Sequence, residues 1–166
     1  MAPKLEEVMI LHVEQAKDDQ LRMGGTKGGA MRAVSPLNGG YLKGDNINAS
    51  LVQGGSDWIK FDTASGTVYL DARVHFRDPA TDSIFYFRAE GISRLDEKSA
   101  LIFAWSPEAK TTQASDHYLF VSPIFEVSKE EHKWMEQHCF VGHGFYTAPG
   151  DGTQGVTFTI YKLVSA

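Results

Sequence analysis

A strict alternation of apolar and polar side chains over residues 67–77 constrains the fold of this chain more than any other feature of the sequence. Apolar residues occupy every second position: Val68, Leu70, Ala72, Val74 and Phe76. Successive side chains of a β-strand point to opposite faces, so this period of two predicts a strand with one buried face. Turn residues fill 78–82, and a second alternation over 83–92 follows. The two segments together predict a β-hairpin.

The rest of the chain repeats this rhythm more weakly. Pairs of glycines separate short segments rich in Val, Ile, Thr, Tyr and Phe, which is typical of strands joined by turns or bulges. Further strands are predicted over 5–14, 29–36, 46–53, 57–62, 99–105, 117–127, 138–147 and 156–164. Residues 128–137 favour a short helix, because Ser128 and Glu131 have the spacing of a capping box.

About ten strands and one short helix predict an all-β fold. A flat sheet of that many strands would leave long open edges, so closure into a barrel or a two-sheet sandwich is expected. We expect a single antiparallel β-barrel of about ten strands with one short helix near 128–137. The length of 166 residues suits a single domain spanning 1–166.

Composition excludes several classes of function. The net charge is −5 and the basic residues are scattered, which disfavours nucleic acid and anionic membrane surfaces as partners. Cys139 is the single cysteine, so no disulfide framework is expected and a cytoplasmic location is natural. Phosphate-loop, dinucleotide, zincin and nucleophile-elbow motifs are missing from the sequence. Six scattered histidines favour no metal site, and we expect no cofactor.

Four charged residues of the predicted hairpin form one expected patch. Asp71 and Arg73 share a face of the first strand, and Arg88 and Glu90 share a face of the second. One interpretation places them on the solvated outer face as cross-strand ion pairs. The other places them inside, at the floor of a cavity.

Two further carboxylates are candidates for acid chemistry. Glu126 lies beside Phe125, and Asp57 lies beside Trp58. If aromatic neighbours desolvate a carboxyl group, its pKa rises toward neutrality and it can act as a general acid. The alternative for each is simple exposure at the end of a strand.

A set of motifs occurs in fixed order along the chain: Asn-Gly-Gly at 38–40 with Gly44, Gly-Gly-Ser-Asp-Trp at 54–58, Gly-Thr at 66–67 and Leu-Asp-Ala-Arg at 70–73. This ordered set resembles the family called domain of unknown function 3237. Later similarities extend the resemblance over essentially the whole chain. It implies a compact antiparallel barrel, often self-associating, with no established cofactor. Fungal members are thought to close an oxygen ring by adding a phenol hydroxyl across an alkene.

This resemblance implies a cofactor-free cyclase, an isomerase of secondary-metabolite biosynthesis, acting on a small prenylated phenol. Such a reaction needs a proton donor to carbon, and Asp57 or Glu126 suits that role better than a carboxylate paired with arginine. Glu90 would orient the substrate and Arg73 would stabilise a phenolate. Aromatic rings would shield the cation. The expected substrate-binding set is Trp58, Tyr86, Arg88, Tyr118, Phe120, Trp134 and His143.

Two other functions remain open at this stage. The same barrel could be a non-catalytic, lipocalin-like carrier of a small molecule. Alternatively, the chain could be an interaction protein that buries an apolar patch in a homo-oligomer and contains no pocket. The resemblance favours the cyclase.

Overall fold

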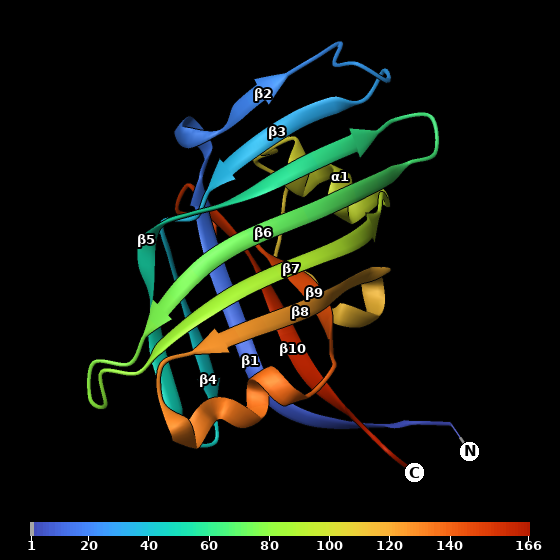
Figure 1. Cartoon of the computed structure of the whole chain (residues 1–166). Helices are drawn as coiled ribbons and strands as arrows, with labels where there is room; N and C mark the ends of the chain where they lie inside the picture. The colour runs from blue at the N-terminus through green and yellow to red at the C-terminus, as the bar shows by residue number, and fades with distance from the viewer. Residues whose placement is uncertain (1) are drawn as a thin grey trace.

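The computed structural model describes residues 2–166, which form a closed antiparallel β-barrel (Figure 1). Hydrogen bonding closes eight strands into a ring in the order β5-β4-β1-β10-β9-β8-β7-β6 and back to β5. The prediction of an all-β barrel is therefore confirmed. The strands are β1 (Lys4–Ala16), β2 (Leu21–Met23), β3 (Met31–Pro36), β4 (Gly39–Gly44), β5 (Ile47–Asp62), β6 (Thr67–Arg77), β7 (Ile84–Arg94), β8 (Leu119–Val127), β9 (Phe140–Thr147) and β10 (Thr153–Val164).

The predicted hairpin is the β6–β7 pair. Its register runs without a break from Thr67 opposite Arg94 to Arg77 opposite Ile84. The Asp78 carboxylate accepts the backbone N–H groups of Ala80 (2.8 Å) and Thr81 (3.4 Å), which fixes the connecting loop. The alternation in sequence thus predicted both the strands and their pairing.

β5 is one long strand where the sequence predicted two. Its first half pairs with β4 and its second half with β3, while β6 runs along both halves. The register with β6 shifts between Val52 and Ser56, and Gly54 there has φ +117°, a conformation that favours glycine. This bulge lets β5 leave the ring, and β3 and β2 extend the sheet beyond one end of the barrel (Figure 1).

The helices differ from the prediction in two places. Residues 99–105 were predicted as a strand, and this was wrong: α1 (Glu97–Phe103) is the α-helix of the fold. The Asp96 side chain accepts the backbone N–H of Ser99, and Ser99 Oγ accepts that of Asp96, forming a capping box. The apolar run after Ser99 is compatible with either structure, so only the cap decides between them.

The short helix near 128–137 is present as the 3-10 helix η3 (Glu130–Gln137), but Ser128 does not cap it. Instead, Ser128 Oγ accepts the backbone N–H of Ile84 at 2.8 Å. Two more 3-10 turns are η1 (Lys17–Asp19) and η2 (Ala114–Asp116). α1 lies at the same end of the barrel as β2 and β3, and η3 covers the opposite end (Figure 1).

Large apolar side chains fill most of the barrel interior. They alternate along each strand with outward-facing polar residues, as a half-buried sheet requires. The most completely buried side chains include Leu11, Leu42, Phe76, Phe85, Phe125 and Ile160. Toward the end near α1, the interior opens into a cavity.

Candidate functional site

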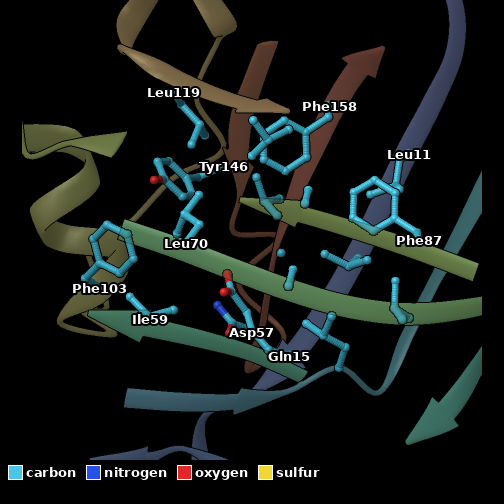
Figure 2. A pocket seen from close by; sticks show the side chains of 18 residues that line it. Leu11, Gln15, Asp57, Ile59, Leu70, Phe87, Phe103, Leu119, Tyr146 and Phe158 are labelled. Carbon is cyan, nitrogen blue, oxygen red and sulfur yellow. The ribbon is translucent and has the colours of Figure 1, made fainter. Parts of the chain in front are cut away.

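The interior cavity is lined by seven strands of the ring and by Phe103 at the end of α1 (Figure 2). The cavity volume that is open to the centres of water molecules is about 50 Å³, which is enough for a few water molecules. A larger ligand therefore requires the lining side chains to move. Its walls are almost entirely apolar and include Leu11, Val13, Ile59, Leu70, Val74, Phe87, Phe103, Leu119, Val121 and Phe158.

Asp57 is the carboxyl group of this cavity. It follows the β5 bulge, and its side chain points inward like that of Ile59 two residues later (Figure 2). It is half-buried, and its side chain lines the cavity. Burial raises its pKa from 3.8 to about 7; the charge of Asp71 adds to the rise, and the hydrogen bond from the Asp71 backbone N–H opposes it. Near neutral pH, Asp57 therefore holds its proton in much of the population.

The hydrogen bond from the Asp71 backbone N–H determines which oxygen of Asp57 carries the proton. The Asp71 N–H donates to Oδ1 at 3.0 Å, so Oδ1 acts as the acceptor and Oδ2 carries the proton. An acid with one oxygen held by the backbone and the other carrying a proton has a fixed orientation. The geometry can deliver a proton into an apolar space.

Tyr146 of β9 supplies a second polar group. Its hydroxyl donates to Ser93 Oγ at 2.8 Å, and burial raises its pKa, so it stays neutral. Two glycines precede it at alternate positions. A Cβ at Gly144 would lie 2.6 Å from the Phe158 ring, and one at Gly142 would lie 2.7 Å from Val121 Cγ2. The missing side chains let Phe158 lie against β9.

A buried hydrogen-bond network holds Tyr146 and α1 together. His117 Nδ1 lies 2.6 Å from Asp96 Oδ2, and His117 Nε2 lies 2.8 Å from Thr112 Oγ1. This order of acid, imidazole and hydroxyl resembles a hydrolase triad. However, Thr112 Oγ1 accepts the Tyr146 N–H and donates to the Tyr146 carbonyl oxygen, and Thr112 lies outside the cavity lining. The network therefore fixes structure.

Gln15 of β1 is the third polar group of the lining. It follows the inward-facing Met9, Leu11 and Val13 at the same two-residue spacing. Sequence reasoning missed it, although its position in this alternation was a usable signal. Sequence reasoning also missed Tyr146, although its position on the same face of β9 as Gly142 and Gly144 was a usable signal.

The structure places the hairpin cluster on the outer face of the barrel. Arg73 Nε lies 3.6 Å and Arg88 Nε 4.0 Å from Asp71 Oδ1, and Arg88 also pairs with Glu90. Of the two interpretations left open, the outward one matches the geometry. Glu126 is also exposed, opposite Tyr86 on the outside of β8.

The predicted aromatic and histidine residues lie outside the cavity too. Trp58 faces outward, with the Arg73 guanidinium 5.9 Å from its ring centre. Phe120 stacks on His143 with ring centres 4.5 Å apart. Tyr118 is exposed, and Trp134 of η3 packs on Phe140. Of the eleven predicted site residues, the structure brings Asp57 alone into the cavity.

Two features of the described part of the chain bear on other site types. Among residues 2–166, no group of three or more His, Cys, Asp or Glu side chains is arranged to hold a metal ion. No helix in that range is both long and apolar enough to cross a membrane.

The fold and the cavity define a class of protein: a small closed antiparallel barrel with an apolar interior and one protonatable carboxyl group. The chain belongs to the family described as Protein of unknown function (DUF3237), whose model matches residues 3–163. No curated protein sequence matches it.

Solved structures share this fold at low sequence identity. A Clostridium acetobutylicum protein of unknown function is 23% identical with a TM-score of 0.76, covering 98% of each chain. A Rhodopseudomonas palustris protein of unknown function is 20% identical with a TM-score of 0.77, covering 99% of this chain and all of that one. An enzyme from Penicillium herquei is 14% identical with a TM-score of 0.59, covering 98% and 96%. These likenesses show the fold.

Proposed function

We propose that this protein is a cofactor-independent cyclase that adds a phenol hydroxyl across a prenyl alkene within one molecule. One observation carries the proposal: a carboxyl group whose pKa burial raises to about 7 faces a largely apolar cavity. Protonation of an unactivated alkene needs such an acid, held away from water. The fungal enzyme of the same fold and the family resemblance lend support.

The reaction balances with the residues of the cavity. Asp57 Oδ2 gives its proton to the less substituted alkene carbon, forming a C–H bond and a tertiary cation. The rings of Phe87 and Phe158 shield that cation. The phenol oxygen then forms the C–O bond, and its proton returns to Asp57. The product is an isomer of the substrate, and no electron acceptor is required.

The direct test is incubation of the purified, chelator-treated protein with 2-prenylphenol. We expect a cyclic ether of unchanged mass and altered retention time. Asp57→Asn should lower kcat about 10²- to 10⁴-fold, the usual contribution of one positioned acid. The rate should fall as pH rises through about 7, because the acid loses its proton there.

Matched variants separate Asp57 from the outer-face candidates. Glu126→Gln and Arg73→Ala change exposed groups outside the cavity, so each should keep kcat within about two-fold. Full activity in Asp57→Asn, or loss of activity on chelation, would contradict the proposed mechanism.

A non-catalytic carrier is the second candidate, and the apolar lining favours it. A carrier would bind the same phenol and release it chemically unchanged. Recovery of bound but unconverted 2-prenylphenol after long incubation therefore distinguishes the two functions. A cytoplasmic location, a lack of nucleic-acid or membrane partners, and self-association belong to the proposal in either case.

A further inference from the structure

The polar end of the cavity contains an amide whose orientation is fixed by a chain of hydrogen bonds. Buried Ser35 donates from Oγ to Gln20 Oε1 at 2.8 Å, and Gln20 Nε2 donates to Gln15 Oε1 at 3.0 Å. Because the Gln15 carbonyl oxygen is engaged, its amide nitrogen is left as a donor. Across residues 2–166, no hydrogen bond uses Gln15 Nε2. Gln15 and Asp57 both line the cavity (Figure 2).

A second amide lies directly opposite on the neighbouring strand. Gln154 of β10 pairs with Gln15 of β1, and cross-strand partners project from the same face of a sheet. Gln154 is only 5% exposed, yet its Oε1 has no hydrogen-bond partner within the described chain. The next residues, Gly155 and Val156, line the cavity, whereas Gln154 itself is buried and is not part of the lining, so a ligand reaches its Oε1 only once the lining side chains move. A buried acceptor without a partner is unfavourable unless a ligand or water satisfies it.

We propose that Gln15 and Gln154 form a hydroxyl-binding pair at the polar end of the cavity. The Gln15 amide N–H donates to the hydroxyl oxygen of the ligand, and Gln154 Oε1 accepts the hydroxyl hydrogen. Apart from Asp57 and Tyr146, the remaining lining is apolar, so the ligand is an alcohol or phenol with a hydrocarbon body. This inference deepens the proposed function and rests on the same cavity: the pair holds the reacting hydroxyl beside Asp57.

A hydroxyl-binding pair has a specific consequence for affinity. A methyl ether keeps the oxygen acceptor but loses the donor, so it leaves Gln154 unsatisfied. A site built to bind a hydroxyl discriminates against analogues without it. Gln20 does not line the cavity, and its role is to position Gln15.

The test uses 2-(3-methylbutyl)phenol and its methyl ether, which lack the alkene and cannot cyclise. Isothermal titration calorimetry on the full chain should show about ten-fold tighter binding of the phenol. Gln154→Met, of similar length but without amide hydrogen bonding, should weaken phenol binding about five-fold and leave ether binding unchanged, which reduces the discrimination. Gln15→Met removes a donor that the oxygen of either ligand accepts, so it should weaken binding of the phenol and of the ether about five-fold each. Gln20→Met should weaken both ligands in the same way, because Gln20 orients Gln15.

Gln137→Met, an exposed change in η3 at the far end of the barrel, is the matched control and should leave both affinities unchanged. Equal affinity for the phenol and the ether, binding of neither, full discrimination in Gln154→Met, or unchanged affinities in Gln15→Met overturns the inference. If discrimination holds but 2-prenylphenol is not cyclised, the hydroxyl-binding pair stands and the cyclase proposal fails.

Discussion

Asp57 differs from other carboxylates of the chain in the direction of its pKa shift. Burial raises its pKa, whereas hydrogen bonds from Thr153 lower the pKa of Asp151 in an exposed turn. The two residues therefore affect stability in opposite ways. A carboxyl group with a raised folded-state pKa destabilises the native state once it ionises, and one with a lowered pKa stabilises it.

The first prediction is that Asp57→Asn stabilises the protein in a pH-dependent way. Below about pH 4, the carboxyl group is protonated in both states and the substitution should change little. As pH rises to 7, only the unfolded state ionises freely, so the wild type loses stability relative to the variant. Raising the pKa from 3.8 to about 7 corresponds to about 4 kcal/mol above pH 7.

Urea unfolding at about pH 2.5 and pH 8 measures this difference. Asp151→Asn is the control with the opposite sign, since its carboxylate stabilises the fold at pH 8 and loses that effect as the pH falls below the ordinary carboxyl pKa of 3.8. An equal effect of Asp57→Asn at the two pH values would show that burial does not perturb this group.

At the scale of elements, the β5 bulge positions the acid. Gly55 lies within it, and a Cβ there would be 2.6 Å from the Arg73 carbonyl oxygen and 2.9 Å from Val74 Cβ. β5 and β6 can approach this closely only because Gly55 has no side chain. Asp57 accepts the Asp71 N–H from the same strand pair, so the bulge and the acid share one local geometry.

We therefore predict that Gly55→Ala destabilises the fold by about 1–3 kcal/mol, since the clash is with backbone as well as side chain. It should also shift the pH at which cyclisation declines, because the contact between Asp57 and Asp71 moves. Gly24→Ala, where nothing lies within 4 Å of the added Cβ and φ is not positive, is the matched control. Chemical denaturation and a pH–rate profile of both variants measure these effects. Stability equal to wild type in Gly55→Ala would contradict the role of the bulge.

The sequence predicted elements better than it predicted which of their faces turn inward. In β6 and β7 the alternation is clear, yet Tyr69 of β6 and Tyr86 of β7 place aromatic rings on the outside, as does Trp58 of the neighbouring β5. Periodicity alone therefore did not separate the cavity side from the solvent side. Asp57 was predicted from its aromatic neighbour Trp58, but Trp58 points away and strands from the rest of the ring supply the apolar surroundings. Only the closed ring brings Gln15, Phe87 and Phe158 to Asp57.

At the scale of the whole molecule, the barrel separates two apolar regions. The inner one is the core and its cavity. The outer one is a patch of exposed large side chains on β5 to β7 and just before β8, namely Trp58, Tyr69, Ile92 and Tyr118. Charged groups of both signs border it, including Arg32, Lys60, Asp71 and Glu90. A two-fold axis could set each cation of one copy against an anion of the other, so this surface suits the pairing of two copies.

The last prediction is that this outer patch mediates self-association, and two isoleucines of β7 provide the test. Ile92 lies in the patch and is 40% exposed, while Ile84 is 43% exposed at the other end of the same strand. Ile92→Arg places a charge in the proposed interface and should yield monomers, whereas Ile84→Arg should behave like the wild type. Sedimentation velocity between about 1 and 100 µM measures both, a range that covers weak and strong dimers. A wild type that stays monomeric throughout, or two variants with the same behaviour, would remove this patch as the interface and leave the interior cavity as the functional surface.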